Sequence, residues 1–311
     1  MKVSNKEELR DLILKGITAE ELKAYDYSNI TDMSFMFLDC TSLTSIPCLD
    51  TSNVLDMWSM FSGCALLTSI PCLDTSNVTD MSSMFEDCRS LITIPELDTS
   101  NVKNTIAMFG GCISLTSIPK IDTSNVLNMS YMFGGCTSLT SIPELDTSNV
   151  LDMSLMFKEC VLLTSIPYLD TSKVLNIGYM FKSCKSLISV PYLDTSNVTD
   201  MDCMFEGCES LVSVPNLDTS RVTNMNYMFG DCISLTSIPE LDYSNVLNMC
   251  AMFKRCKSLR AIPELNTSNI TDMRDMLTNC INLEHCFYDS RINYNEINSL
   301  KLKENYPEFF I

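Results

Sequence analysis

Hydrophobic and polar positions follow one pattern along almost the whole chain, and this pattern returns every 24 residues. In one copy the apolar residues Met81, Met84, Phe85 and Cys88 keep the spacing i, i+3, i+4, i+7 of a single helix face. The segment that follows has the form Ser-Leu-x-Ser-Ile-Pro, as at 138–143, and it ends at a proline, which cannot donate a ladder hydrogen bond. Each copy is therefore predicted to hold a short helix of about two turns and one short β-strand.

An aspartate marks the start of each copy and keeps its spacing without insertion or deletion. The eleven positions are Asp26, Asp50, Asp74, Asp98, Asp122, Asp146, Asp170, Asp194, Asp218, Asp242 and Asn266. Strict repetition at such a period is typical of a solenoid, in which each copy is one coil that buries its apolar face against its neighbours. The pattern predicts eleven stacked coils.

Two polar columns are expected to fix the turns of each coil. Six residues after the aspartate every copy carries Asp or Asn, a residue type suited to cap the short helix that follows. These residues are Asp32, Asp56, Asp80, Asn104, Asn128, Asp152, Asn176, Asp200, Asn224, Asn248 and Asp272. The first aspartate itself precedes Thr-Ser-Asn in most copies, so we expect its carboxylate to accept nearby backbone N–H groups as an Asx turn.

The motif M-F-x-x-C-x-S-L-T-S-I-P followed by L-D-T-S-N-V-x-[DN]-M resembles the BspA-like leucine-rich repeats. In particular, it is similar to the variant repeated in surface proteins and lipoproteins of mycoplasmas, spirochaetes and gut bacteria, and in some phage and protist proteins. The resemblance covers about residues 25–287. It implies a curved α/β solenoid with a parallel β-sheet on one face and short helices on the other, roles in adhesion or protein–protein contact, and no catalysis.

A third polar column resembles the asparagine ladder of leucine-rich repeats, where side-chain amides bridge backbone groups of successive turns. Its members are Asn29, Asn53, Asn77, Asn101, Asn125, Asn149, Asn197, Asn245 and Asn269.

The ends of the chain depart from the repeat and are predicted to cover it, because the terminal coils of a solenoid would otherwise expose a core face. We expect an N-terminal helical cap at 1–24, the repeat at 25–287 and a C-terminal cap at 288–311. The segments 4–7 and 18–21 both fit the capping box, and Gly16 is expected to end the first helix. A helix near 293–304 is predicted in the C-terminal cap.

Eleven of the sixteen cysteines share one column on the apolar stripe, where cysteine behaves as a small hydrophobe. We expect these thiols to be free and shielded from solvent. Cys48 and Cys72 occupy another column in consecutive copies and are the pair most open to oxidation. The ladder cysteines are Cys40, Cys64, Cys88, Cys112, Cys136, Cys160, Cys184, Cys208, Cys232, Cys256 and Cys280.

Metal binding and catalysis find little support in the pattern. The single histidine, His285, lies beside Cys286 and five residues after Cys280, which does not match a structural zinc site with four N or S ligands. The aspartate column offers one carboxylate per copy without the glycines of calcium-binding repeats, so capping is preferred over calcium. A repeat also supplies no unique nucleophile with a base. We expect no metal, no cofactor and no enzyme activity.

Composition and charge narrow the partner. With 46% apolar residues the chain has ample material for a core, and a net charge of −18 disfavours nucleic acid and anionic membranes as partners. A basic or neutral protein partner is expected, without a small-molecule substrate. The segment 1–10 lacks the apolar run of a secretory signal, and no apolar stretch approaches the ~18 residues of a membrane span. A cytoplasmic location without membrane insertion is expected, with surface or virion display by another route left open.

Function is expected in the columns that vary from copy to copy. Tyrosine is a good interface anchor because it buries a large area at low entropy cost. Tyr168 and Tyr192 fall in consecutive copies after the predicted strand, where they could stack, and Glu144 contributes to an acidic rim. A second column, on the predicted helix side, carries further tyrosines with lysines nearby. The residues of this second group are Tyr131, Tyr179, Tyr227, Lys182 and Lys185.

These features predict a non-catalytic leucine-rich-repeat scaffold that binds another macromolecule, most simply a protein. Two alternatives remain at this point. The first is a surface or virion adhesin. The second is an acidic protein that mimics nucleic acid and occupies a DNA-binding enzyme, which requires the aspartate column to lie exposed along one face.

Overall fold

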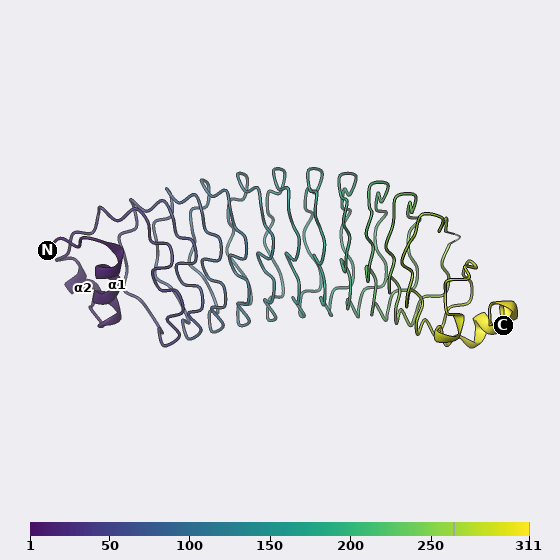
Figure 1. Ribbon diagram of the computed structural model, residues 1–311. Helices are drawn as coiled ribbons and strands as arrows, with labels where there is room; N and C mark the ends of the chain where they lie inside the picture. The colour runs from purple at the N-terminus through teal and green to yellow at the C-terminus, as the bar shows by residue number, and fades with distance from the viewer. Residues whose placement is uncertain (264, 311) are drawn as a thin grey trace. The chain divides into compact units, whose positions relative to one another are not determined.

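The computed structural model of the protein describes residues 1–263 and 265–310. The chain forms two compact units, Met1–Val150 and Leu151–Ile311. Within each unit, Figure 1 shows narrow coils that follow one another as the chain proceeds. Helices in the described residues occur only towards the two ends of the chain: α1 Lys6–Leu14, α2 Ala19–Leu22, the 3-10 helix η1 Tyr294–Glu296, α3 Leu300–Asn305 and the 3-10 helix η2 Pro307–Phe310.

The core of each unit is built from columns of identical residues, as the repeat predicts. Phe61 and Phe85 in the first unit are fully buried, and their rings stack with centroids 5.7 Å apart. In the second unit Phe181 and Phe205 repeat this arrangement at 5.5 Å. Methionine, leucine and valine columns are buried around the phenylalanines. The predicted solenoid is confirmed, because each coil buries its apolar face against the coils beside it.

The predicted helix of each coil is wrong, since the segment consists of tight turns. Met84 N donates to Met81 O, which is the i to i+3 bond of a β-turn, and Ser83 at the third position has a φ of 52°. A positive φ at that position is the mark of a type II turn. Phe85 N, meanwhile, donates across to Met108 O of the next coil at 2.9 Å. Because N–H groups of this segment bond to the neighbouring coil, they cannot form the i to i+4 bonds of an α-helix.

The same left-handed backbone recurs at two positions of every coil. The first column with positive φ is Phe35, Ser59, Ser83, Ala107, Tyr131, Leu155, Tyr179, Cys203, Tyr227, Ala251 and Asp275. The second lies four residues later and contains Asp39, Gly63, Asp87, Gly111, Gly135, Glu159, Ser183, Gly207, Asp231, Arg255 and Asn279. Neither column holds a valine, isoleucine or threonine, the residue types that tolerate positive φ least.

The predicted parallel sheet is also wrong in place and extent. The described residues contain no extended strand, and most coils instead pair through a single parallel bridge at the Asx column, such as Asp56↔Asp80. Thr79 N donates to Leu55 O at 3.0 Å beside that bridge. The Ser-Leu-x-Ser-Ile-Pro segments lie side by side with longer contacts, for example Ile92 N to Thr68 O at 3.5 Å. The coils are therefore held by turns, short bridges and side-chain ladders.

Of the three polar columns, the aspartate and asparagine columns act as predicted, whereas the Asx column does not cap a helix. The carboxylate of Asp74 accepts from the backbone and the hydroxyl of Ser76 at 3.0 and 2.7 Å, which is the expected Asx turn. The Asx residue six positions later forms a similar turn, with Ser82 N donating to Asp80, although no helix begins there. In the asparagine ladder, Asn77 Nδ2 donates to Ser52 O of the preceding coil at 2.9 Å.

A threonine column adds a ladder that the sequence pattern had not suggested. The buried hydroxyl of Thr75 donates to Asp98 O of the following coil at 2.8 Å, and Thr195 does the same to Asp218 O. Threonine sits next to the aspartate in most coils, so each Asp-Thr pair bonds within its own coil and to the next one.

The N-terminal helices contact the first coil. Asn5 caps α1 by accepting from Glu8 N, one residue later than the predicted cap, whereas Thr18 forms the predicted capping box with Glu21. Gly16, with a φ of 85°, follows α1 as expected. Lys6 Nζ reaches the first coil, where it donates to Asp32 at 3.0 Å and to a backbone carbonyl.

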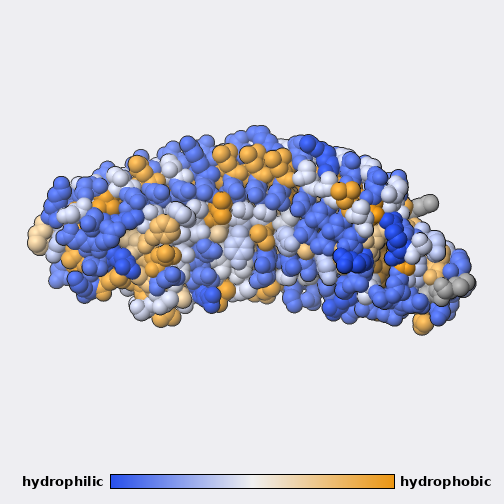
Figure 2. All heavy atoms as spheres, viewed as in Figure 1, coloured by the Kyte–Doolittle hydropathy of each residue, from blue (hydrophilic) through white to orange (hydrophobic). Residues whose placement is uncertain are grey.

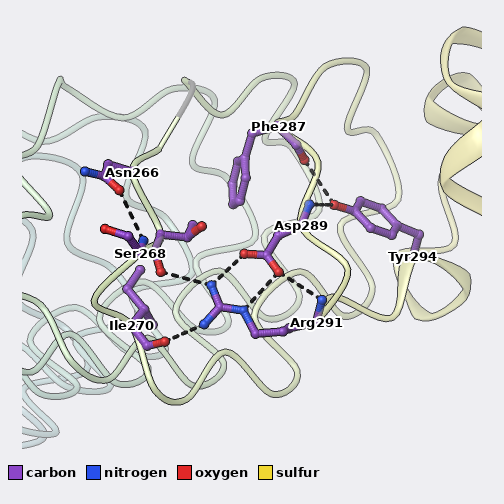
Figure 3. A network of polar contacts seen from close by, with 8 residues as sticks. Asn266, Ser268, Ile270, Phe287, Asp289, Arg291 and Tyr294 are labelled. Carbon is purple, nitrogen blue, oxygen red and sulfur yellow. Dashed lines mark hydrogen bonds and ion pairs between the residues drawn. The ribbon is translucent and has the colours of Figure 1, made fainter.

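At the other end, the single helix predicted near 293–304 is replaced by η1 and α3, which are separated by Asn298 in the left-handed region. An arginine closes the open edge of the last coils (Figure 3). Arg291 donates to Ile270 O and pairs with Asp289 at 2.6 Å. Tyr294 O–H donates to Phe287 O and accepts from Asp289 N. These bonds satisfy backbone groups that would otherwise end the stack unpaired.

Candidate protein-binding surface

Tyr168 and Tyr192 lie in consecutive coils of the Leu151–Ile311 unit and are 63% and 59% exposed. The residue after each, Leu169 or Leu193, is buried, and the aspartate after that, Asp170 or Asp194, is half-buried. This alternation places each tyrosine on the same side as the aspartate two residues further on. We define the open face as Tyr168, Tyr192 and the aspartates Asp170, Asp194 and Asp218 that follow in the same unit.

The two tyrosines do not form the stacked pair that the coil spacing suggested. Among the described residues no ring contact joins Tyr168 to Tyr192, and both rings keep more than half of their surface in solvent. Their backbone is nevertheless fixed, because the adjacent Leu169 and Leu193 are 0% and 1% exposed. The open face therefore presents two large side chains on a rigid base.

The aspartates beside the tyrosines are held in a defined orientation. Asp194 accepts from the backbone and the hydroxyl of Ser196 through Oδ1, at 3.0 and 2.7 Å. Hydrogen bonds from Ser172 and Ser220 lower the pKa of Asp170 and Asp218, respectively, so both carboxylates are charged at neutral pH. The open face thus combines apolar rings with fixed negative charge.

Glu144 belongs to the other unit. It lies exposed in a shallow hollow of Met1–Val150 that Glu96, Lys120, Asp122 and Asp146 also line. This hollow is formed by the columns equivalent to the open face, which confirms within this unit that the two columns share one side. Here the exposed side chains are charged instead of aromatic.

The second predicted group, Tyr179 with Lys182 and Lys185, is brought together but is already occupied. Tyr179 O–H donates to Asp202 at 2.6 Å, and this bond raises the pKa of the tyrosine above its usual value. Lys182 Nζ lies 5.4 Å from the Tyr179 ring centroid and pairs with Glu206 at 2.7 Å. Lys185 pairs with Glu209 at 2.9 Å. Both lysines are thus paired with acidic residues of the next coil.

Tyr131 and Tyr227 occupy the same column as Tyr179 and are half-buried. The Tyr131 ring packs so closely over Gly134 that a Cβ at this glycine would lie 2.2 Å from it. Tyr227 packs on Gly230 and has Lys254 Nζ at 5.9 Å from its ring centroid. Sequence reasoning grouped these tyrosines with Tyr168 as variable surface residues, whereas the structure gives them intramolecular contacts.

The cysteine column is buried as predicted, with Cys40 at the first coil the half-exposed exception. Each buried thiol has a polar partner, as where Cys88 Sγ donates to Phe61 O at 3.1 Å. Burial raises the pKa of Cys184 to about 12, which keeps the thiol protonated and unreactive. Cys48 and Cys72 are free and exposed.

The described residues contain no group of three or more His, Cys, Asp or Glu side chains arranged to hold a metal ion. His285, near the end of the last copy of the repeat, contacts the hydroxyl of Tyr306 through Nδ1 at 3.2 Å. Within the same described residues, no helix has the length and apolarity needed to cross a membrane.

Exposed aliphatic side chains form a feature that the sequence pattern did not reveal. Leu151 and Leu175, one residue before the bridge column, are 44% and 52% exposed. The signal available in the sequence was the variation of this position between leucine, threonine and lysine. Figure 2 shows hydrophobic side chains on the visible face as small groups among hydrophilic ones. Isolated groups of this size are common on protein surfaces.

Comparisons with known proteins agree with the repeat. The family described as "Mycoplasma protein of unknown function, DUF285" matches residues 12–117, 91–190, 113–211 and 188–290. No curated protein matches the chain.

Among solved structures, the chain is similar to a leucine-rich repeat protein from Bacteroides ovatus, with 19% identity, 86% of this chain and 77% of that chain covered, and a TM-score of 0.49. A leucine rich cell surface protein from Faecalibacterium prausnitzii shares 20% identity over 91% of this chain and 85% of its own, with a TM-score of 0.42. A leucine-rich repeat protein from Eubacterium ventriosum shares 16% identity over 88% of this chain and 86% of its own, with a TM-score of 0.42.

The family match confirms the resemblance of the 24-residue unit to the BspA-like leucine-rich repeats. Because the matched segments together span residues 12–290, the protein belongs to the DUF285 family of mycoplasma proteins.

Proposed function

We propose that the protein is a non-catalytic repeat scaffold that binds another protein through the open face around Tyr168 and Tyr192. The observation that carries this proposal is the exposure of two large aromatic side chains on consecutive coils, at 63% and 59%, above a fully packed core. Aromatic side chains at the centre of an interface commonly carry much of its binding energy. Exposed tyrosines held on rigid backbone lose little entropy on binding.

The contrast with the Tyr179 column supports this choice. The Tyr179 hydroxyl already donates to Asp202, and Lys182 Nζ lies over its ring. A partner would have to compete with both contacts. Tyr168 and Tyr192 have no comparable bonds among the described residues of their unit. This contrast supports the open face over the Tyr179 column as the proposed site.

Affinity capture with the full chain tests this proposal. The parent, the pair variant Tyr168→Ala with Tyr192→Ala, and the control pair Leu151→Ala with Leu175→Ala would each be immobilised and exposed to lysate of the producing cells. The control removes two exposed side chains from the same two coils. Proteins held by the parent and the control should fall at least about tenfold on the tyrosine variant, which corresponds to about 1.4 kcal/mol. Equal retention by all three chains would remove the open face as the site, and no retention by the parent would remove the scaffold function.

A second candidate, the nucleic-acid mimic, keeps one of its premises because the aspartate column is exposed. Asp50, Asp74, Asp98 and Asp122 all lie at the surface of the first unit. Their density argues against it. A single row at the coil spacing of about 4.8 Å carries far fewer charges than duplex DNA, which has one per about 1.7 Å of axis. Competition between the protein and duplex DNA for a DNA-binding enzyme would be required to revive this candidate.

A further inference from the structure

We infer that the open face recognises a cationic segment of its partner, and specifically arginine side chains. This inference rests on the proposed function and names the chemistry of the partner at the same site. It starts from the composition of the face, which offers two exposed tyrosine rings and a row of aspartates. Among the described residues of this unit the columns of the face hold no cation. Lys173 and Arg221 lie outside these columns, three residues after Asp170 and Asp218, and Arg221 donates to Asn197.

The chain places a tyrosine and an aspartate two residues apart twice. The exposed Tyr192 and the half-buried Asp194 flank the buried Leu193, and Tyr168 and Asp170 repeat this one coil earlier. The ring faces are not consumed by stacking on each other. A cation above a tyrosine face is attracted by the ring quadrupole, and a carboxylate within reach adds a charge-assisted hydrogen bond.

Hydrogen bonds within the chain already hold the carboxylates of the open face in one orientation. Both hydrogen bonds that Asp194 accepts use Oδ1, and its Oδ2 accepts none within the described residues. In the following coil, Asp218 is likewise held through Oδ1 by Ser220, at 3.0 and 2.6 Å. A side chain that is already oriented loses less entropy when a ligand arrives.

Arginine fits this combination better than lysine. The planar guanidinium stacks on aromatic rings and donates two parallel hydrogen bonds to a carboxylate, whereas the ammonium of lysine is a compact and strongly hydrated charge. A cation drawn only by the net charge of −18 would show no such preference. The choice between arginine and lysine therefore separates recognition by the open face from general attraction.

The probes are fluorescein-labelled octa-arginine and octa-lysine, which carry equal charge, titrated with the full chain at neutral pH and about 150 mM salt. The parent should bind octa-arginine about fivefold more tightly than octa-lysine, as measured by fluorescence anisotropy. That ratio should fall clearly in the Tyr168→Ala, Tyr192→Ala variant, because the ring contribution is lost while the paired hydrogen bonds to the carboxylates remain. It should persist in the Leu151→Ala, Leu175→Ala control. Asp194→Asn with Asp218→Asn should weaken binding of both peptides.

An arginine preference that is absent from the parent, or unchanged in the tyrosine variant, would overturn the inference. The proposed function fails separately. If the tyrosine variant loses its captured proteins while its preference for octa-arginine over octa-lysine does not change, the open face binds proteins without recognising arginine. Circular dichroism of each variant provides the check that the fold is retained.

Discussion

Two groups of tyrosines in the Leu151–Ile311 unit differ in what the fold has done with them. Tyr179 lies over the tight turns with a left-handed backbone, donates to Asp202 and is covered by Lys182. Tyr168 and Tyr192 follow the extended segment and project into solvent. Both groups look alike in the sequence, as aromatic residues in columns that otherwise vary. A column that varies between the copies of a repeat protein can therefore still stabilise the fold, when its side chains contact the next coil.

The largest expected effect concerns the core that both groups share. Phe181→Ala should lower the free energy of unfolding by about 3–5 kcal/mol, because it removes a fully buried ring from between two stacked neighbours. Tyr168→Ala in the adjacent coil should change it by less than about 0.5 kcal/mol. Urea unfolding of the two variants measures the difference. Equal losses would show that Tyr168 is as structural as the core.

The second prediction tests whether the Asp289–Arg291 ion pair of the C-terminal cap stabilises the fold. The hydrogen bond from Arg291 lowers the pKa of Asp289 to about 2, and the Asp289 side chain is only 9% exposed. Because the folded pKa is depressed, the stabilisation is complete above the unfolded pKa of about 3.9 and is lost as the pH falls towards 2.

The variant Asp289→Asn should therefore lose on the order of 2 kcal/mol at neutral pH and show a flatter stability profile between about pH 5 and pH 2. Chemical unfolding across this range measures both, with Glu308→Gln as the control at an exposed carboxylate of the same cap. A profile that keeps the parent's slope would mean that the Asp289–Arg291 pair does not stabilise the fold.

A third effect tests the turn geometry that holds Tyr179 in place. Ser83 occupies the equivalent position in the first unit with a φ of 52°. Ser83→Val should cost about 1–2 kcal/mol or more, because a β-branched side chain resists the left-handed region. Ser83→Ala is the matched control and should cost distinctly less. If valine is accepted as readily as alanine, the segment is not built from these turns.

The smallest effect compares the two tyrosine hydroxyls directly. Tyr179→Phe should cost about 1 kcal/mol, because it removes the hydrogen bond to Asp202. Tyr168→Phe should leave the unfolding midpoint unchanged. Should both substitutions be silent, the distinction between the two groups would rest on exposure alone.

The sequence was sufficient for the solenoid, the burial of the phenylalanine and cysteine columns, and the asparagine ladder. These features could be predicted because they require only that equivalent side chains of consecutive copies contact one another. It was not sufficient for the local backbone. The spacing of Met81, Met84, Phe85 and Cys88 fits a helix, yet a pair of consecutive type II turns places the same residues inward. The absence of β-branched residues at the positions of Ser83 and Asp87 was the available sign of positive φ.

The candidate site was predictable only in part. Tyr168 and Tyr192 could be selected from their column, but nothing in the sequence showed that Tyr179 meets Asp202 of the next coil. That contact depends on the path of the turn between coils. The ion pair of Lys182 with Glu206 could, by contrast, have been predicted, since the two residues occupy equivalent positions in consecutive copies.

The most direct measurement places a photo-crosslinking residue at one position at a time in the full chain, at Tyr168, Tyr192, Tyr179 or Tyr227, and irradiates the protein in lysate of the producing cells. Crosslinks to another protein are expected from positions 168 and 192, with few or none from positions 179 and 227. Crosslinks to another protein that arise mainly from positions 179 and 227 would contradict the proposed site.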